Sequence, residues 1–236
     1  MTIRVCATAA VPSGMSLEGR TRVARALSRL GGSVNELTRS HATVHQEGSV
    51  GAGDLTWDFE FGDNAASAGF EARVSADGWA AAFEAMDSAD RELLIGLSEL
   101  EAWRIEVLDS HVETSGLVGV KRTNLVRVRD TADSSEVERW GRAVTALPNH
   151  VPAIRNWCFS RVRAFGPASP RVGWTHSWEQ EFETLEGLVM DYMMSPYHWG
   201  WLDGFYDPEM PQSLIEPELA HLYGFASESV LGWAGS

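Results

Sequence analysis

The sequence predicts an α+β protein in which the order β-α-β-β-α-β occurs twice in succession. In some short segments apolar residues alternate with period two, as in strands, and in others they recur at intervals of three and four, as in helices. Hydrophobic residues make up 44% of the 236 residues and charged residues 22%, as in ordinary globular proteins. The chain is therefore able to bury a core around these elements.

The first pass through this order occupies the N-terminal half. Ser16 can cap a helix in which Val23, Leu27 and Leu30 lie on one face. Residues 55–61 alternate between apolar and polar types, which predicts a strand with one buried face. Strands are predicted at 3–11, 34–46, 55–61 and 103–108, helices after Ser16, at 79–86 and at 91–100, and a loop at 63–69.

The second pass follows a polar stretch, 109–116, which is predicted to be a linker. Asp133 and Glu136 have the spacing of a capping box at the start of a helix. A second helix is predicted to begin near Thr184 and to be interrupted at Pro196. Its predicted apolar face consists of Leu185, Leu188, Val189, Tyr192 and Met193. Strands are predicted at 118–129, 154–162, 174–182 and 218–225.

Two such passes predict two ferredoxin-like domains, at 1–110 and 117–236. In each domain the helices would cover one face of a four-stranded sheet and leave the other face bare. Packing the two bare faces against each other within the chain would bury both.

Composition argues against several classes of function. The formal net charge of −14 disfavours nucleic-acid binding, which depends on Lys and Arg replacing counterions. No apolar run approaches the roughly 20 residues of a membrane helix. Cys6 and Cys158 form no CxxC pair, so we expect free thiols and a cytoplasmic location. His41 and His45 share a strand face without a third ligand, so no metal site is expected.

Two large enzyme classes also lack their sequence signatures. Gly31 and Gly32 close a helix, whereas a phosphate-binding glycine loop opens one. No Ser or Cys occupies a nucleophile elbow between a strand and a helix. Nucleotide-dependent enzymes and triad hydrolases are therefore not expected.

The second half resembles the stress-responsive dimeric α/β-barrel proteins over residues 117–225. The resemblance rests on four segments in the expected order, VGVKRTNLVRVRD, ALPNHVPAIRNW, GWTHSWEQEFET and DYMMSPYHWGW. The first half looks like the same fold without this signature, because Trp57 stands where the family has the histidine of its "TH" pair. Members of the family build barrels from two such units. The resemblance therefore implies an intrachain dimeric α/β-barrel, and it also admits a homodimer of the tandem chain.

The family includes olivetolic acid cyclase, a polyketide cyclase, and some hydroxynitrile lyases, while other members have no known catalytic role. In the cyclase a tyrosine and a histidine six residues apart act as an acid/base pair, and the motif places this pair at Tyr192 and His198. A second pocket histidine aligns with His176. A third aligns with Arg122, so this chain departs from the pattern there, which suggests a pocket that meets a carboxylate or enolate oxygen.

The chemistry of Tyr192 and His198 suits this role. Neutral imidazole is a general base near pH 7, and a phenol can donate a hydrogen bond to a developing oxyanion. Tyr192 also completes an apolar helix face, so an alternative is a core residue with a satisfied hydroxyl. Substrate-binding candidates are Arg122, Asn124, Trp174, His176, Trp178, Tyr197 and Trp199. For these residues, core packing, ion pairing and interface packing are the alternatives.

The predicted function is a cofactor-independent lyase or cyclase that acts on a carbonyl-containing, aromatic or polyketide-like small molecule. One alternative is a noncatalytic ligand-binding or stress-associated barrel. Two others are a cofactor-free monooxygenase and a haem-binding barrel, because chlorite-dismutase-like proteins also join two ferredoxin-like halves. No cofactor, nucleic acid or membrane is expected as a partner.

Overall fold

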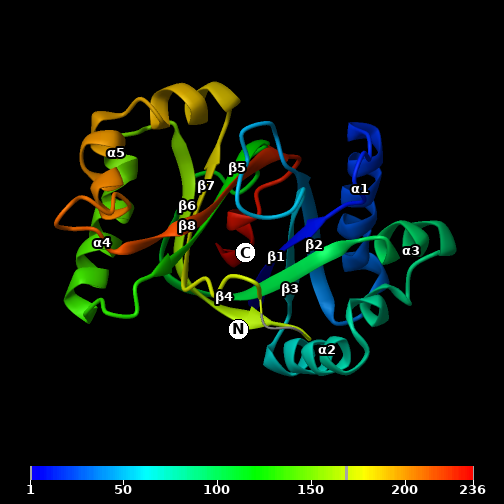
Figure 1. Cartoon of the computed structure of the whole chain (residues 1–236). Coiled ribbons are helices and arrows are strands. Elements are labelled where there is room, and N and C mark those ends of the chain that lie inside the picture. The colour runs from blue at the N-terminus through cyan, green and yellow to red at the C-terminus, as the bar shows by residue number, and fades with distance from the viewer. Residues whose placement is uncertain (1, 168–169, 236) are drawn as a thin grey trace. The chain divides into compact units, whose positions relative to one another are not determined.

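The computed structural model describes residues 2–167 and 170–235 and divides them into two compact units (Figure 1). Each unit is assembled from several stretches of chain. The first consists of residues 1–47, 52–105 and 163–173, and the second of 48–51, 106–162 and 174–236. No described helix is long and apolar enough to cross a membrane.

The first unit has the predicted order β-α-β-β-α-β and an antiparallel sheet in the order β2-β3-β1-β4. Its strands are β1 (Ile3–Ala10), β2 (Leu37–Val44), β3 (Leu55–Phe61) and β4 (Ser98–Val112), and its helices are α1 (Leu17–Ser33), α2 (Asn64–Asp77) and α3 (Ser88–Ile95). The end of β4, beyond Ile105, belongs to the second unit.

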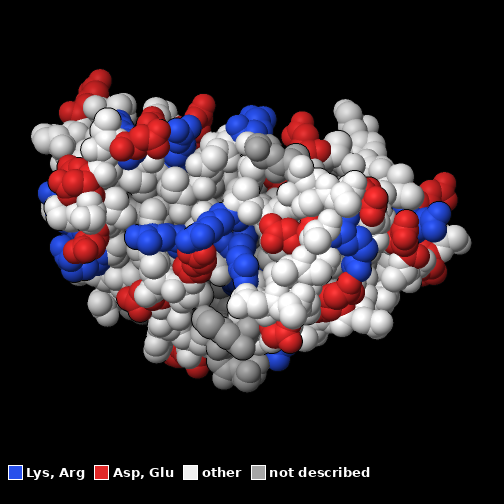
Figure 2. Space-filling model, turned by 90° about the horizontal axis from the view of Figure 1, so that it is seen from below, with Lys and Arg blue, Asp and Glu red and all other residues white. Residues whose placement is uncertain are grey.

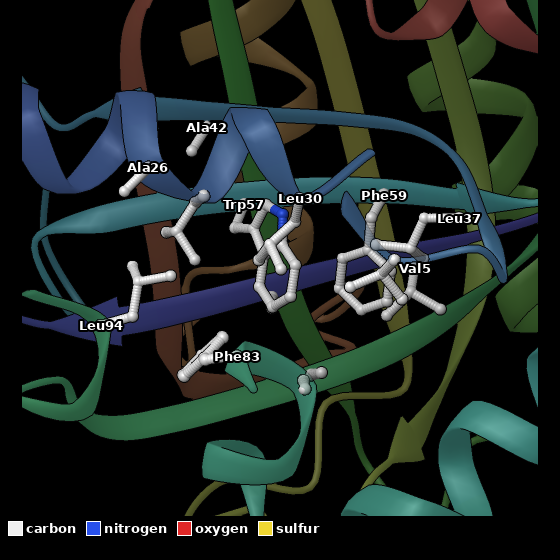
Figure 3. Packing of buried hydrophobic residues seen from close by; sticks show 14 of the residues in the cluster. Val5, Ala26, Leu30, Leu37, Ala42, Trp57, Phe59, Phe83 and Leu94 are labelled. Carbon is white, nitrogen blue, oxygen red and sulfur yellow. The ribbon is translucent and has the colours of Figure 1, made fainter. Parts of the chain in front are cut away.

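An aromatic and aliphatic core fills the first unit. Trp57 stacks on Phe59 with ring centres 4.2 Å apart, and the Trp57 ring nitrogen donates to the Ser40 hydroxyl at 2.9 Å. Figure 3 shows these two rings together with Leu30 of α1 and Val5 of β1. All four apolar side chains are at most 1% exposed. Tightly packed apolar side chains therefore fill the space between this sheet and its helices.

Parts of the first-unit prediction were wrong. Residues 63–69, predicted as a loop, begin helix α2, which Asp63 caps by accepting from the Ala66 N–H at 2.9 Å. This helix escaped prediction because its small residues give almost no apolar periodicity. The predicted helix 91–100 ends at Ile95, and β4 starts at Ser98. Residues 79–83 form a 3-10 turn in place of the predicted helix 79–86.

The second unit repeats the order, with an antiparallel sheet in the order β6-β7-β5-β8. Its strands are β5 (Gly119–Val128), β6 (Ile154–Phe165), β7 (His176–Phe182) and β8 (Ile215–Ala226), and its helices are α4 (Ser134–Ala146), a π-helix (Gly187–Tyr192) and α5 (Pro196–Gly200). The capping box is present, since Asp133 accepts from the Glu136 N–H at 2.9 Å and Glu136 from the Asp133 N–H at 3.0 Å. The stretch predicted as a linker continues β4 as far as Val112.

The face of β7 that carries Glu179 and Glu181 is buried as well. Glu179 forms an ion pair of 3.0 Å with Lys121. The Glu181 carboxylate accepts from the Ser229 hydroxyl at 2.6 Å and from the Val230 N–H at 2.7 Å. The C-terminal segment thus covers Glu181, and hydrogen bonds stabilise the carboxylate charge that burial would otherwise penalise.

On the molecular face drawn in Figure 2, acidic side chains are scattered among basic ones.

Candidate active site

Strand register gathers the polar residues of the second unit on one face of its sheet. Arg122 of β5 lies opposite Gln180 of β7 and Tyr223 of β8. Asn124, two residues further along, lies between Trp178 and His221. Because side chains two residues apart on a strand point to the same face, all of these lie on the same side as the helices.

Arg122 is the charged centre of this face and is only 4% exposed. Its Nε donates to Nε2 of His221 at 2.6 Å, and its Nη1 donates to Oε1 of Gln180. Its guanidinium carbon lies 4.8 Å from the centre of the Tyr192 ring, which is a cation-π contact. Among the described residues no carboxylate lies within ion-pair distance of this guanidinium.

A π-helix positions Tyr192. Thr184 starts the segment by accepting from the Gly187 N–H at 3.1 Å, and the Met193 N–H donates to the Leu188 carbonyl, five residues back, at 3.2 Å. The wider turn leaves Leu188 and Tyr192 buried while Val189 and Met193 are 40% and 39% exposed. The prediction of one continuous apolar face was wrong for Val189 and Met193. Single π-turns occur frequently at functional sites.

Helix α5 brings His198 back onto Tyr192. Ser195 is extended, Pro196 starts the helix, and His198 follows two residues later. The ring centres of Tyr192 and His198 are 4.4 Å apart, and Nε2 of His198 lies 3.6 Å from a carboxylate oxygen of Asp203. The six-residue spacing in the sequence thus becomes direct contact between the two rings.

His221 is held by strand β8 and by a short segment that pairs with it. Backbone hydrogen bonds of 2.9 Å join Val50 and His221 in both directions. Gly51 has a φ of +98°, and a Cβ there would lie 2.2 Å from the Leu219 carbonyl oxygen. Glycine is therefore required for this close approach of the two backbones.

These side chains surround a cavity of about 160 Å³. Its lining consists of Arg122, Asn124, Tyr192, Met193, His198, Leu202, Asp203, Tyr206, Leu219 and His221. Asn124 donates to the Tyr206 hydroxyl at 3.3 Å. Two buried polar atoms of the lining, Nδ1 of His198 and Oδ1 of Asn124, have no hydrogen-bond partner among the described residues. Buried polar atoms normally have partners, so these two fit a ligand that supplies them.

The electrostatics keep the two histidines neutral and the tyrosine protonated. Burial and the Arg122 charge lower the pKa of His198 to about 4. The Arg122 charge and burial lower the pKa of His221 to about 3. Burial raises the pKa of Tyr192, although the Arg122 charge opposes this, and burial also raises the pKa of Asp203. At neutral pH the cavity is therefore lined by two neutral imidazoles and by a phenol that keeps its proton and can donate.

Four of the predicted site residues meet at this cavity: Arg122, Asn124, Tyr192 and His198. His176 lines a different cavity, of about 630 Å³, together with Phe159 and Arg161. Burial and the Arg161 charge lower the pKa of His176 to about 4.

The remaining predicted residues also lie outside the lining of the smaller cavity. Trp174 and Trp178 are buried, and Trp178 packs against Trp157 with ring centres 5.5 Å apart. The Tyr197 hydroxyl donates to the Ala143 carbonyl at 3.1 Å. Trp199 is 60% exposed.

Sequence reasoning missed His221, Asp203 and Tyr206. His221 could have been predicted to lie on the same strand face as Leu219 and Tyr223, because these residues alternate on the predicted last strand. Asp203 and Tyr206 follow α5 in a short 3-10 turn and its end, which have no periodic pattern. The sequence around Asp203 and Tyr206 does not differ from that of an ordinary surface loop, so their place in the cavity lining could not be predicted.

A tandem α+β fold with a tyrosine and a histidine at one cavity is the arrangement expected of the α/β-barrel class. Residues 120–208 match the family model described as the Stress responsive A/B Barrel Domain. The second unit thus carries the domain that the four sequence segments predicted. No protein with a curated description matches the sequence.

Solved structures share the fold of the whole chain at low sequence identity. An anthrone oxidase-like protein has a TM-score of 0.58 and 9% identity, over 95% of this chain and 90% of that one. A candidate monooxygenase from Fusobacterium nucleatum has a TM-score of 0.56 and 10% identity, over 95% and 91%. A candidate chlorite dismutase has a TM-score of 0.52 and 9% identity, over 95% and 94%. Identities this low show a common fold and carry no activity from one protein to another.

Proposed function

We propose that the protein is a cofactor-independent lyase or cyclase that uses general acid/base chemistry on a small carbonyl compound. The observation that carries this proposal is the contact between the Tyr192 and His198 rings beside the buried Arg122, at the wall of one cavity. A base, an oxyanion donor and a fixed positive charge are the groups that proton removal next to a carbonyl requires.

The first step follows from the protonation states. Neutral His198 accepts a proton from the carbon next to the substrate carbonyl, and the C–H electron pair moves into the enolate. The enolate oxygen receives a hydrogen bond from the Tyr192 hydroxyl and faces the Arg122 charge. His198 becomes imidazolium and later returns the proton. The same enolate can form or break a carbon–carbon bond, so cyclisation and retro-aldol cleavage share this step.

Burial and the Arg122 charge hold the pKa of His198 at about 4, which is low for a general base, and the enolate would raise this pKa. Its negative charge offsets the Arg122 charge that disfavours imidazolium. Imidazolium and enolate thus stabilise each other beside buried side chains, where electrostatic interactions are stronger than in water. Because burial raises the pKa of Tyr192, the phenol keeps its proton and stays a donor.

A noncatalytic ligand-binding barrel is the second candidate. Tyr192 is only 1% exposed and contacts Phe182 with ring centres 6.0 Å apart, as a core residue would. Haem does not fit the cavity around Tyr192, because about 160 Å³ lies below the roughly 300–1,000 Å³ that drug-sized ligands occupy.

A deuterium-exchange experiment distinguishes the lyase or cyclase from the noncatalytic binding barrel. Small ketones, hydroxycarbonyl compounds and keto acids are incubated with the protein in D₂O, and loss of the C–H signal next to the carbonyl is followed by NMR. Catalysis predicts exchange above the buffer rate that depends on His198, with His150→Gln as a surface control. Binding shifts without enzyme-dependent exchange would refute the lyase proposal and favour the binding barrel. Oxygen consumption in the same samples would instead support a monooxygenase.

A further inference from the structure

We infer that the substrate of this site is a small monocarboxylate whose carboxylate pairs with Arg122. This inference rests on the proposed function only for the placement of the reacting carbonyl near Tyr192 and His198. Its basis is the buried guanidinium, which is 4% exposed and has no carboxylate partner in the described part of the chain. Burying an unpaired charge is costly, so buried charges are normally paired. A carboxylate ligand would supply the missing charge.

The hydrogen bonds of Arg122 leave a suitable edge free. A guanidinium has five N–H donors. One Nε donor goes to His221 and one Nη1 donor goes to Gln180, which leaves three. Two of the remaining donors, one on each terminal nitrogen, form the fork that binds a carboxylate through two parallel hydrogen bonds.

His221 acts as a positioning residue for this fork. Arginine can only donate, so Nε2 of His221 must be the acceptor and the ring must carry its proton on Nδ1. His221 is in turn held by the two backbone hydrogen bonds to Val50. Arg122 is therefore fixed before a ligand binds, which lowers the entropy cost of binding.

The charges of the lining favour one negative charge over two. Arg122 is the single cationic side chain of the lining, and Asp203 is the single acidic one. A phosphate dianion carries two negative charges, of which Arg122 could neutralise one, and the other would be repelled by the Asp203 carboxylate. A monocarboxylate matches the single charge of Arg122 and is repelled less by Asp203 than a dianion would be.

The size of the cavity limits the rest of the molecule. A volume of about 160 Å³ holds a short keto acid and not a long polyketide chain. With the carboxylate on Arg122, the carbonyl of such an acid reaches the rings of Tyr192 and His198, which contact each other beside the guanidinium.

The test compares 4-oxopentanoate with hexane-2,5-dione, in which an acetyl group replaces the carboxylate. Calorimetric titration of the full chain, in a buffer without carboxylates, should show a preference for 4-oxopentanoate of about tenfold or more. Arg122→Gln should weaken its binding by about 30-fold or more, the usual effect of removing one partner of a buried charge pair. Arg122→Lys should be intermediate, because it keeps the charge and loses the fork.

Arg127→Gln is the matched control. Arg127 lies on the same strand, points to the other face, and pairs with Asp130 at 3.1 Å. This variant should bind 4-oxopentanoate as the wild type does. Arg122→Gln should fold normally, because it removes a buried charge that pairs with no carboxylate among residues 2–167 and 170–235, and its melting temperature checks this.

Proton uptake gives a second readout. A bound carboxylate offsets the Arg122 charge that disfavours imidazolium at His198, so binding at pH 5.5 should take up protons and binding at pH 8 should not. Asp203, Tyr192, Tyr206 and His221 are the other titratable groups that line the cavity. Titrations in buffers of different ionisation enthalpy measure this uptake, and His198→Gln should reduce it.

The outcomes separate this inference from the proposed function. Equal affinity for the two probes, or binding of neither, overturns the carboxylate inference, and exchange catalysis on neutral ketones would then still support the lyase. Carboxylate binding that depends on Arg122, without any exchange that depends on His198, supports the inference and refutes the lyase.

Discussion

Arg122 sets the chemistry of the residues around it. Its positive charge helps to lower the pKa of both His198 and His221, and it faces the Tyr192 ring. The sequence identified Arg122 and Asn124 as candidate binding residues and paired Tyr192 with His198 by family resemblance. It could not show that no described carboxylate pairs with Arg122, because this depends on strands β5, β7 and β8 meeting side by side.

The buried histidines make stability depend on pH. The pKa values of His176 and His198 in the folded state are about 4, below the ordinary value of 6.5. The unfolded state therefore binds more protons between pH 6.5 and pH 4, and the free energy of unfolding falls as pH falls through this window. For each histidine the loss has an upper limit of about 3 kcal/mol.

Urea unfolding at several pH values between 7.5 and 4.5 measures this dependence. His176→Gln serves as the comparison, since His176 lies outside the lining of the site cavity. The variant should lose less stability than the wild type between pH 6.5 and 4.5. Identical slopes for the two proteins would contradict the lowered pKa of His176.

At the scale of elements, strands were predicted better than the segments that carry the site. The eight predicted strands lie near strands that the structure describes, because apolar residues alternate along strands that have an apolar, helix-covered face. The π-helix was predicted as an ordinary amphipathic helix, since the intervals between its apolar residues also fit an α-helix. The contact of Gly48–Gly51 with β8 was also missed, because nothing local in a glycine-rich turn identifies a distant partner.

This turn should support the site through His221. Gly51→Ala places a Cβ against the Leu219 carbonyl and forces alanine to a φ of +98°. The segment should separate from β8, with a loss of about 1–3 kcal/mol in stability, and affinity for 4-oxopentanoate should fall with it. Gly14→Ala is the control, because Gly14 has a φ of +82° but nothing lies within 4 Å of its Cβ position. Equal binding by the two variants would show that the turn does not support the site.

At the scale of the whole molecule, the two units share a fold and differ in what fills it. In the first unit Val5 and Ala7 lie opposite Phe59 and Trp57, and all four are at most 1% exposed. In the second unit Arg122 and Asn124 occupy the opening strand and line a cavity. The sequence predicted a difference between the halves, because the first half lacks the family signature and has Trp57 in place of the histidine of the "TH" pair.

One ligand per chain should follow from this asymmetry. Calorimetric titration with 4-oxopentanoate should give a stoichiometry of about one, and Arg122→Gln should weaken this binding by about 30-fold or more. At the corresponding place the first unit has Val5, Ala7, Phe59 and Trp57, none of which is charged. A second anion should therefore not bind there. A stoichiometry of two, or wild-type affinity in Arg122→Gln, would contradict this account.

The comparison of Tyr192→Phe and His198→Ala with the wild type tests the acid/base role most directly. Exchange of the C–H next to the carbonyl should slow by about 10²–10⁴-fold in His198→Ala, the usual contribution of a general base. Tyr192→Phe keeps the ring, so the melting temperature should barely change while the barrier rises by roughly 2.7–4 kcal/mol. Tyr197→Phe is the matched control, because its hydroxyl donates to the Ala143 carbonyl outside the cavity lining. Wild-type exchange rates in both Tyr192→Phe and His198→Ala would contradict the account and leave a binding barrel.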